Sequence, residues 1–198
     1  MSMIHKAYCF DTKAFDNDLR EIITKCVDGN NLSELRSFIC DNVEFLSSPY
    51  SFDALDEDWQ DELENGEIQE LSDFALTRYY DVSDDIGLEE SWNSLLESLK
   101  AIKMLNDYSY YVIGEEFSVG DFCLDPGGMG LGFVDVNEIT NIKEELIEKR
   151  DYFGKAIQKT KVDTIYELTT EEIENAYSQL IDIYEQAEKN QKGLMFTF

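Results

Sequence analysis

Each end of the chain carries a short apolar segment with the alternation of a β-strand. Ile4–Phe10 places every second side chain on one face, and Leu194–Phe198 follows Gly193 at the other end. A single strand is not stable on its own. We therefore expect the two segments to lie in one sheet, which would anchor both ends of the 198-residue chain in the fold.

The sequence between these strands has mainly the apolar spacing of amphipathic helices. We expect helices between residues 12 and 29, 33 and 46, 53 and 66, 67 and 79, 88 and 104, 138 and 150, and 170 and 192. Thr169 and Glu172 form a capping box at the start of the last helix. Aromatic and β-branched residues predict two internal strands, at 108–114 and 131–136.

These elements predict an α+β fold, in which a small mixed sheet containing both terminal strands is packed by about five to seven helices. The chain has two prolines, no Gly/Ser-rich linker and no internal repeat. We therefore expect a single α+β domain that spans residues 1–198.

Charge is concentrated in one part of the sequence. The whole chain has 16 basic and 43 acidic residues, a net charge of −27. Residues 37–99 contain one basic and 18 acidic residues, a net charge of −17. Such a segment is either a solvated face that keeps the protein soluble or an electrostatic surface that attracts a basic partner. Weak binding of divalent cations is a third interpretation.

For the partner interpretation, the candidate binding residues are the acidic side chains of two groups and one tyrosine. They are Asp56, Glu57, Asp58, Asp61 and Glu62, then Asp84 and Asp85, with Tyr80 as an aromatic anchor. Aromatic residues often anchor interfaces. Trp59 and Trp92 lie on apolar helical faces and are expected in the core, whereas Tyr80 is the better candidate for exposure.

The same charge argues against nucleic acid and anionic membranes as partners, because their phosphates would be repelled. No apolar run has the length of a membrane span or of a signal peptide, so we expect a cytoplasmic protein. The four cysteines form no Cys-x-x-Cys motif and are expected to be free thiols, with Cys26 and Cys40 buried.

The usual motifs for catalysis and cofactor binding are missing. His5 is the only histidine, which excludes a histidine-rich metal site. The acidic loop that begins at Asp81 does not match an EF-hand, and we expect no metal site and no cofactor. The stretch Gly127–Gly132 lacks a phosphate-binding lysine and precedes a strand, so it predicts a turn with close backbone packing. Carboxylates are too abundant for a catalytic pair to be selected.

The chain ends show a family resemblance. Met1-Ser2-Met3-Ile4 leads into a strand, and residues 179–187 (Gln-Leu-Ile-Asp-Ile-Tyr-Glu-Gln-Ala) lead through Gly193 into the last strand. This pattern resembles the YfbM-like family of small bacterial α+β proteins, with Ser2 at a position that is usually glycine. The resemblance implies fold class, bacterial origin and a cytoplasmic location, and it supplies no catalytic residue.

The sequence therefore favours a non-enzymatic, acidic protein that binds a basic protein partner. In composition and size it is similar to bacterial immunity proteins, which suggests an immunity- or inhibitor-like role. Two alternatives stay open: a carboxylate- or divalent-cation-dependent enzyme whose pocket is lined by the Gly127–Gly132 loop, and a mimic of the phosphate array of DNA. The oligomeric state is not indicated.

Overall fold

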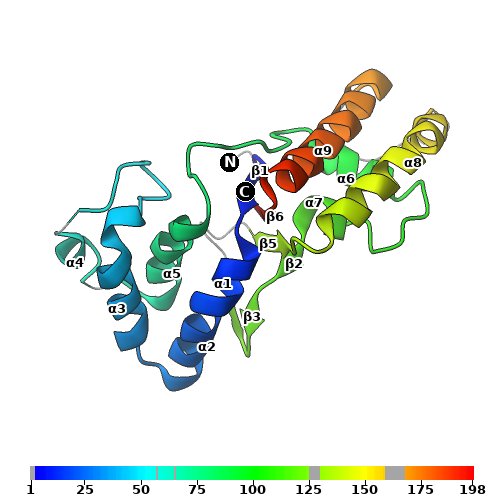
Figure 1. Cartoon of the computed structure of the whole chain (residues 1–198). Helices are drawn as coiled ribbons and strands as arrows, with labels where there is room; N and C mark the ends of the chain where they lie inside the picture. The colour runs from blue at the N-terminus through cyan, green and yellow to red at the C-terminus, as the bar shows by residue number, and fades with distance from the viewer. Residues whose placement is uncertain (1–2, 57, 65, 125–129, 159–167) are drawn as a thin grey trace.

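A four-stranded sheet at the centre of the molecule organises the helices (Figure 1). The computed structural model describes residues 3–56, 58–64, 66–124, 130–158 and 168–198. The described strands are β1 (Lys6–Phe10), β2 (Glu115–Glu116), β3 (Ser118–Val119), β4 (Phe122–Cys123), β5 (Leu131–Val134) and β6 (Gly193–Thr197).

Helices make up most of the rest of the described chain. The N-terminal half contains α1 (Thr12–Asp18), α2 (Arg20–Gly29), α3 (Ser33–Asn42), α4 (Trp59–Glu62) and α5 (Ile68–Leu76), with 3-10 turns η1 (Val43–Phe45) and η2 (Thr77–Tyr79). The helices that follow are α6 (Trp92–Leu99), α7 (Tyr110–Ile113), α8 (Ile139–Ile157) and α9 (Thr170–Asn190).

The sheet confirms the expected pairing of the chain ends. Its strand order is β1-β6-β5-β2, and β3 and β4 form a separate two-stranded sheet. β1 and β6 run antiparallel from the pair Lys6–Thr197 to the pair Phe10–Gly193. All pairings between the described strands are antiparallel, so the fold class is α+β as predicted, but the sheet is not mixed.

Side-chain alternation along the strands creates two cores, one on each face of the sheet. Ala7 and Cys9 of β1 face a core formed with α6, α7, α8 and α9. Tyr8 and Phe10 face a second core formed with α1, α2, α3 and α5. Figure 1 shows the two groups of helices on opposite sides of the strands.

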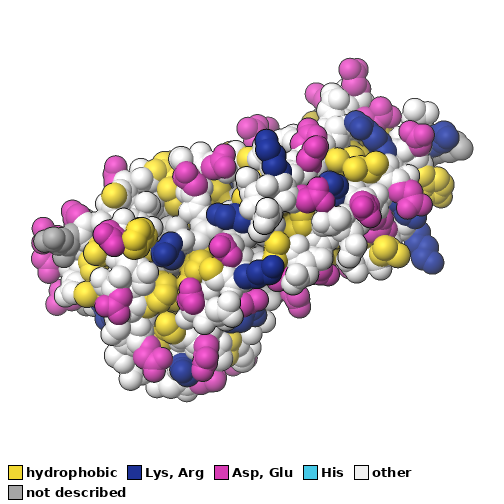
Figure 2. Space-filling view, in the orientation of Figure 1, with side chains coloured by type: hydrophobic (Ala, Val, Ile, Leu, Met, Phe, Trp, Pro, Cys, Tyr) yellow, Lys and Arg dark blue, Asp and Glu magenta, His cyan; other side chains and the backbone are white. Residues whose placement is uncertain are grey.

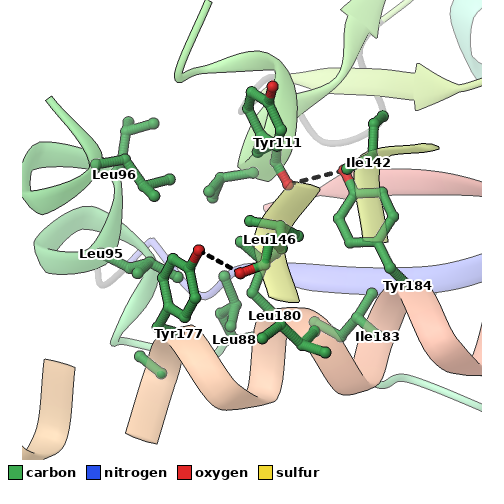
Figure 3. Packing of buried hydrophobic residues seen from close by; sticks show 14 of the residues in the cluster. Leu88, Leu95, Leu96, Tyr111, Ile142, Leu146, Tyr177, Leu180, Ile183 and Tyr184 are labelled. Carbon is green, nitrogen blue, oxygen red and sulfur yellow. Dashed lines mark hydrogen bonds between the residues drawn. The ribbon is translucent and has the colours of Figure 1, made fainter. Parts of the chain in front are cut away.

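In the core around α9, the hydroxyl groups of the buried tyrosines Tyr111, Tyr177 and Tyr184 are hydrogen-bonded, and Figure 3 draws the bonds of Tyr177 and Tyr184. Tyr177 donates to the Leu146 carbonyl over 2.8 Å, and Tyr184 donates to the Tyr111 carbonyl over 3.0 Å. The Tyr111 hydroxyl donates over 2.5 Å to Glu145, a carboxylate that is only 6% exposed. A buried polar group is tolerated when it is paired in this way.

The capping box predicted at Thr169 and Glu172 is present, with both of its hydrogen bonds, at the start of α9. The strand predicted at 108–114 is wrong, because this segment contains the short helix α7. Asp107 accepts a hydrogen bond from the Ser109 backbone N–H and thereby begins a turn. Tyr111 and Val112 are then fully buried, so tertiary packing overrides their β propensity.

The predicted helices 53–66 and 88–104 are longer than the observed α4 and α6. The glycine-rich stretch is described only from Gly130 onward. A Cβ atom on Gly132 would lie 2.1 Å from the Ile113 carbonyl oxygen, so the predicted close backbone packing is confirmed at this glycine. Residues 127–129 lie outside the described residues.

All four cysteines are free thiols. Cys9 and Cys26 are buried, but Cys40 is exposed, which corrects the expectation for it. Cys40 follows the buried Ile39 on α3 and therefore points away from the apolar face. In the described part of the chain, no helix combines the length and the apolar character that a bilayer span requires.

Candidate functional site

The predicted partner-binding residues occupy two separate places. Asp56, Asp58 and Asp61 are exposed around α4, at the left end of Figure 1. The side chain of Glu62, and Glu57 as a whole, lie outside what the structure describes. Figure 2 shows Asp and Glu side chains at this end and across the rest of the same face, with Lys and Arg between them.

The second group lies along β1. The Asp85 carboxylate accepts hydrogen bonds from the backbone N–H of Ala7 (3.1 Å) and of Gly87 (2.8 Å), so it joins this loop to the strand. Asp84 is exposed. Tyr80 is half-buried rather than an exposed anchor, because its ring packs against Tyr8 with 4.7 Å between the ring centroids.

Tyr80 lines a cavity of about 150 Å³ at the ends of β1 and β6, which we call the tyrosine cleft. Its lining residues come from the two strands, from the loop after η1, from α5 and from the residue after η2. They are Lys6, Tyr8, Pro49, Tyr50, Asp73, Leu76, Tyr80, Met195, Thr197 and Phe198. The antiparallel register and the two-residue repeat of β-strands place the β1 and β6 members on one face.

Asp73 is the buried charged group of the tyrosine cleft. It lies on α5 and is 2% exposed. Its carboxylate accepts a hydrogen bond from the Tyr50 hydroxyl (2.8 Å) and another from the Gln69 side-chain amide (2.6 Å). Tyr50 is itself 58% exposed, so a single hydrogen bond links the buried carboxylate to a side chain at the surface.

The pKa values of the three tyrosines of the cleft are raised by burial and by nearby carboxylates. Burial is the main reason that the pKa of Tyr8, of Tyr50 and of Tyr80 is raised above its usual value. The next causes include the carboxylate of Asp85 for Tyr8, and that of Asp73 for the other two. The tyrosine hydroxyls therefore stay protonated, and the carboxylates of Asp73 and Asp85 act electrostatically on the side chains of the cleft.

Two of these hydroxyl groups are available to a ligand. Tyr8 is 5% exposed, yet its hydroxyl forms no hydrogen bond with another described residue, and the same holds for the Tyr80 hydroxyl. Both side chains line the cavity. A polar group in a largely buried position is usually paired, so these hydroxyls are candidates for contact with a bound molecule.

A loop with exposed aromatic side chains borders the cleft. Ser47 and Ala54 form an isolated bridge that closes this loop. Tyr50 and Phe52 at its tip are 58% and 51% exposed, and Phe45 just before it is 53% exposed. Phe52 has a φ of 66°, in the left-handed region that bulky residues rarely adopt. The sequence signal for this loop is a pair of aromatic residues after Pro49, outside any helical apolar stripe.

A second cavity, of about 140 Å³, is lined by carboxylates. These are Asp16, Glu115, Glu116, Asp135 and Glu138. Arg20 lies in the same cavity and bonds Asp16 over 2.5 Å, and the Tyr110 hydroxyl donates to Glu138. Among the described residues, no group of three or more His, Cys, Asp or Glu side chains is arranged to hold a metal ion.

Comparison with known proteins finds no matching family model, no matching curated protein and no matching solved structure. The resemblance to the YfbM-like family stays a prediction. The tyrosine cleft and the distribution of charge are therefore the observations on which a functional assignment rests.

Proposed function

We propose that this protein is a non-enzymatic binding protein whose partner is a basic protein, in an immunity- or inhibitor-like role. The observation that carries the proposal is the tyrosine cleft, where a buried carboxylate and three tyrosines lie beside an exposed aromatic loop. Aromatic side chains around a pocket are typical of the residues that contribute most of the binding energy at interfaces.

The surrounding charge supports the same proposal. Between described residues, a single ion pair involves a carboxylate of residues 37–99, the pair Lys100–Glu97. Arg78, the one basic residue of this segment, lies 4.6 Å from the centre of the Phe45 ring. The acidic excess is thus directed mainly toward solvent, where it speeds the encounter with a positively charged protein.

The experiment is capture from a lysate of the native host, with elution by increasing salt. Wild type is compared with a triple variant, Asp56→Lys, Asp58→Lys and Asp61→Lys, and with an equally charged control at the other end of the molecule. The control replaces three exposed carboxylates of α8 and α9 by lysine, in the triple variant Glu144→Lys, Glu148→Lys and Asp182→Lys.

The proposal predicts one basic protein that wild type and control hold to moderate salt and that the α4 variant releases earlier. A mixture of unrelated basic proteins, all released together at low salt, would show that the acidic surface is only solvated. If both variants released the captured protein at the same lower salt concentration, net charge rather than the surface around α4 would control retention. Competition by added duplex DNA would indicate that the partner is a DNA-binding protein and favour the DNA-mimic alternative.

The carboxylate-lined cavity is the specific observation for a second candidate, a carboxylate- or divalent-cation-dependent enzyme, although its described carboxylates form no group arranged to hold a metal ion. Its test is a calorimetric titration with Mg²⁺ and with Ca²⁺, on wild type and on Glu138→Gln. Binding that the substitution weakens would favour this candidate. Absence of binding, or binding that the substitution leaves unchanged, would count against it.

A further inference from the structure

The tyrosine cleft offers two kinds of group that recognise one kind of ligand. The side chains of Tyr8, Tyr50 and Tyr80 line the cavity, and aromatic rings attract cations. The Asp73 carboxylate supplies a negative charge inside the cavity. We propose that the tyrosine cleft binds an arginine side chain of the basic partner. This inference rests on the proposed function and names the group that the site recognises.

A guanidinium group fits these surroundings better than an ammonium group. The acceptors are dispersed, because the Asp73 carboxylate and the hydroxyls of Tyr8 and Tyr80 come from three different elements. Guanidinium carries five N–H donors in one plane and stacks on aromatic rings. An ammonium group is compact and strongly hydrated, so it loses more on entering a cavity of this kind.

Size and access agree with a single side chain. The cavity holds about 150 Å³, which suits the end of one long side chain rather than a folded element. Tyr50 is 58% exposed at its border, and Lys6 and Thr197 are half-buried at the ends of their strands. An arginine from a protein that contacts the aromatic loop can therefore enter beside Tyr50.

Lys6 is the charge that opposes this ligand. It lines the cleft and forms no ion pair with another described residue. The opposing carboxylates are Asp73 inside the cleft, and Glu70 and Asp85, which act electrostatically on Tyr50 and Tyr8. Removal of Lys6 is thus expected to strengthen the binding of a cation, whereas it would abolish the binding of an anion.

The test uses free amino-acid amides as probes, so it does not require the partner. N-acetyl-arginine amide, N-acetyl-lysine amide and the neutral isostere N-acetyl-citrulline amide are titrated into the full chain with ¹³C-labelled tyrosine. Shifts of the Tyr8, Tyr50 and Tyr80 ring signals are followed by NMR. A single side chain should bind in roughly the millimolar range.

We expect the arginine probe to shift these signals with at least about tenfold higher affinity than citrulline, because one correct charged contact is worth about that factor. Lysine should bind more weakly than arginine. Lys6→Gln should increase the affinity for arginine severalfold, and Asp73→Asn should reduce it about tenfold. Glu148→Gln, which removes an exposed carboxylate of α8 outside the proposed binding surface, should leave it unchanged.

Three outcomes would overturn the inference. They are equal binding of arginine and citrulline, shifts that avoid the cleft tyrosines, and loss of binding in Lys6→Gln together with binding of N-acetyl-glutamate amide. If Asp73→Asn does not fold, Tyr8→Phe replaces it, because that change removes a hydroxyl with no partner among the described residues, and it should weaken arginine binding.

Failure of this inference is distinguishable from failure of the proposed function. Arginine binding in the cleft without any retained basic protein would refute the proposed function and keep the cleft assignment. A retained basic protein, held equally well by wild type and Asp73→Asn, would refute the cleft assignment and keep the proposed function.

Discussion

Acidification should destabilise this protein through His5, the only histidine in the chain. His5 is fully buried, and its two ring nitrogens have different partners. Nδ1 accepts a hydrogen bond from the Leu88 backbone N–H (3.1 Å), so the ring proton is on Nε2, which donates to the Val112 carbonyl (2.7 Å). Protonation would place an N–H donor at Nδ1 opposite another donor.

Burial is the main reason that the pKa of His5 is lowered from 6.5 to about 4 in the folded protein. Between these two pKa values the unfolded chain binds a proton that the folded protein does not. The free energy of unfolding is therefore greatest above pH 6.5 and decreases as the pH falls toward 4. One pKa unit corresponds to 1.36 kcal/mol, so the lowered pKa of His5 contributes about 3 kcal/mol to the free energy of unfolding at high pH. About 2 kcal/mol of this contribution is lost between pH 7 and pH 5.

The assay is urea unfolding at pH 7, 6 and 5 at constant ionic strength, with wild type and His5→Gln. The glutamine cannot titrate in this range, so it should lack the loss of about 2 kcal/mol, although it is less stable than wild type at pH 7 because the Leu88 N–H loses its partner. Subtracting the two curves removes the contribution of the carboxylates. The urea dependence should be the same for both proteins at each pH.

An independent measurement covers the case in which His5→Gln does not fold. Because the chain has one histidine, its ring signals in an NMR spectrum are unambiguous. They should show the neutral ring, with the proton on Nε2, throughout pH 7 to 5. A ring that titrates near pH 6.5, or parallel stability curves for wild type and variant, would refute the reasoning.

Three further substitutions test the fold by thermal or urea unfolding. Tyr79→Phe should leave the free energy of unfolding unchanged or raise it by about 1 kcal/mol, because the Tyr79 hydroxyl is buried without a partner among the described residues. A clearly lower free energy of unfolding would contradict this expectation. Gly87→Ala should lower the free energy of unfolding by about 1–3 kcal/mol, because the added Cβ would lie 2.3–2.8 Å from backbone atoms of residues 5–7. The control Gly29→Ala has open space around the added Cβ and should lower it far less. Asp85→Ala should lower the free energy of unfolding by about 1–3 kcal/mol, because two backbone N–H groups lose their acceptor. An unchanged unfolding midpoint would show that water replaces the carboxylate as acceptor.

The parts of the fold that could be predicted depend on local patterns. The terminal strands follow from two-residue alternation, and α9 follows from its capping box and apolar stripe. Trp59 and Trp92 are 3% and 6% exposed, as their positions on apolar faces predicted. The helix α7 could not be predicted in this way, because its residues favour strands and only distant contacts, such as that between Tyr111 and Glu145, select the helix.

The tyrosine cleft could not be predicted because its residues are distant in the sequence. The sequence predicts an exposed Tyr80, but this side chain lines a cavity together with Tyr8 and Tyr50. No sequence pattern distinguishes Asp73 from the other acidic residues of the segment 37–99. Asp73 follows Ser72 and lies one helical turn after Gln69, so its polar neighbours do not indicate a buried position.

The buried carboxylates help to separate a structural role from a binding role. Burying a carboxylate costs free energy, and in a chain with a net charge of −27 the repulsion from other carboxylates adds to that cost. Glu145 offsets it within the core, where it accepts hydrogen bonds from the Tyr111 hydroxyl and the Leu105 backbone N–H. Asp73 is equally buried and also accepts two hydrogen bonds, from the Tyr50 hydroxyl and the Gln69 amide, but unlike Glu145 it lines a cavity beside the hydroxyls of Tyr8 and Tyr80. A cation that enters the tyrosine cleft would compensate the charge, and this is the physical reason for placing the binding site at Asp73 rather than at the more numerous carboxylates around α4.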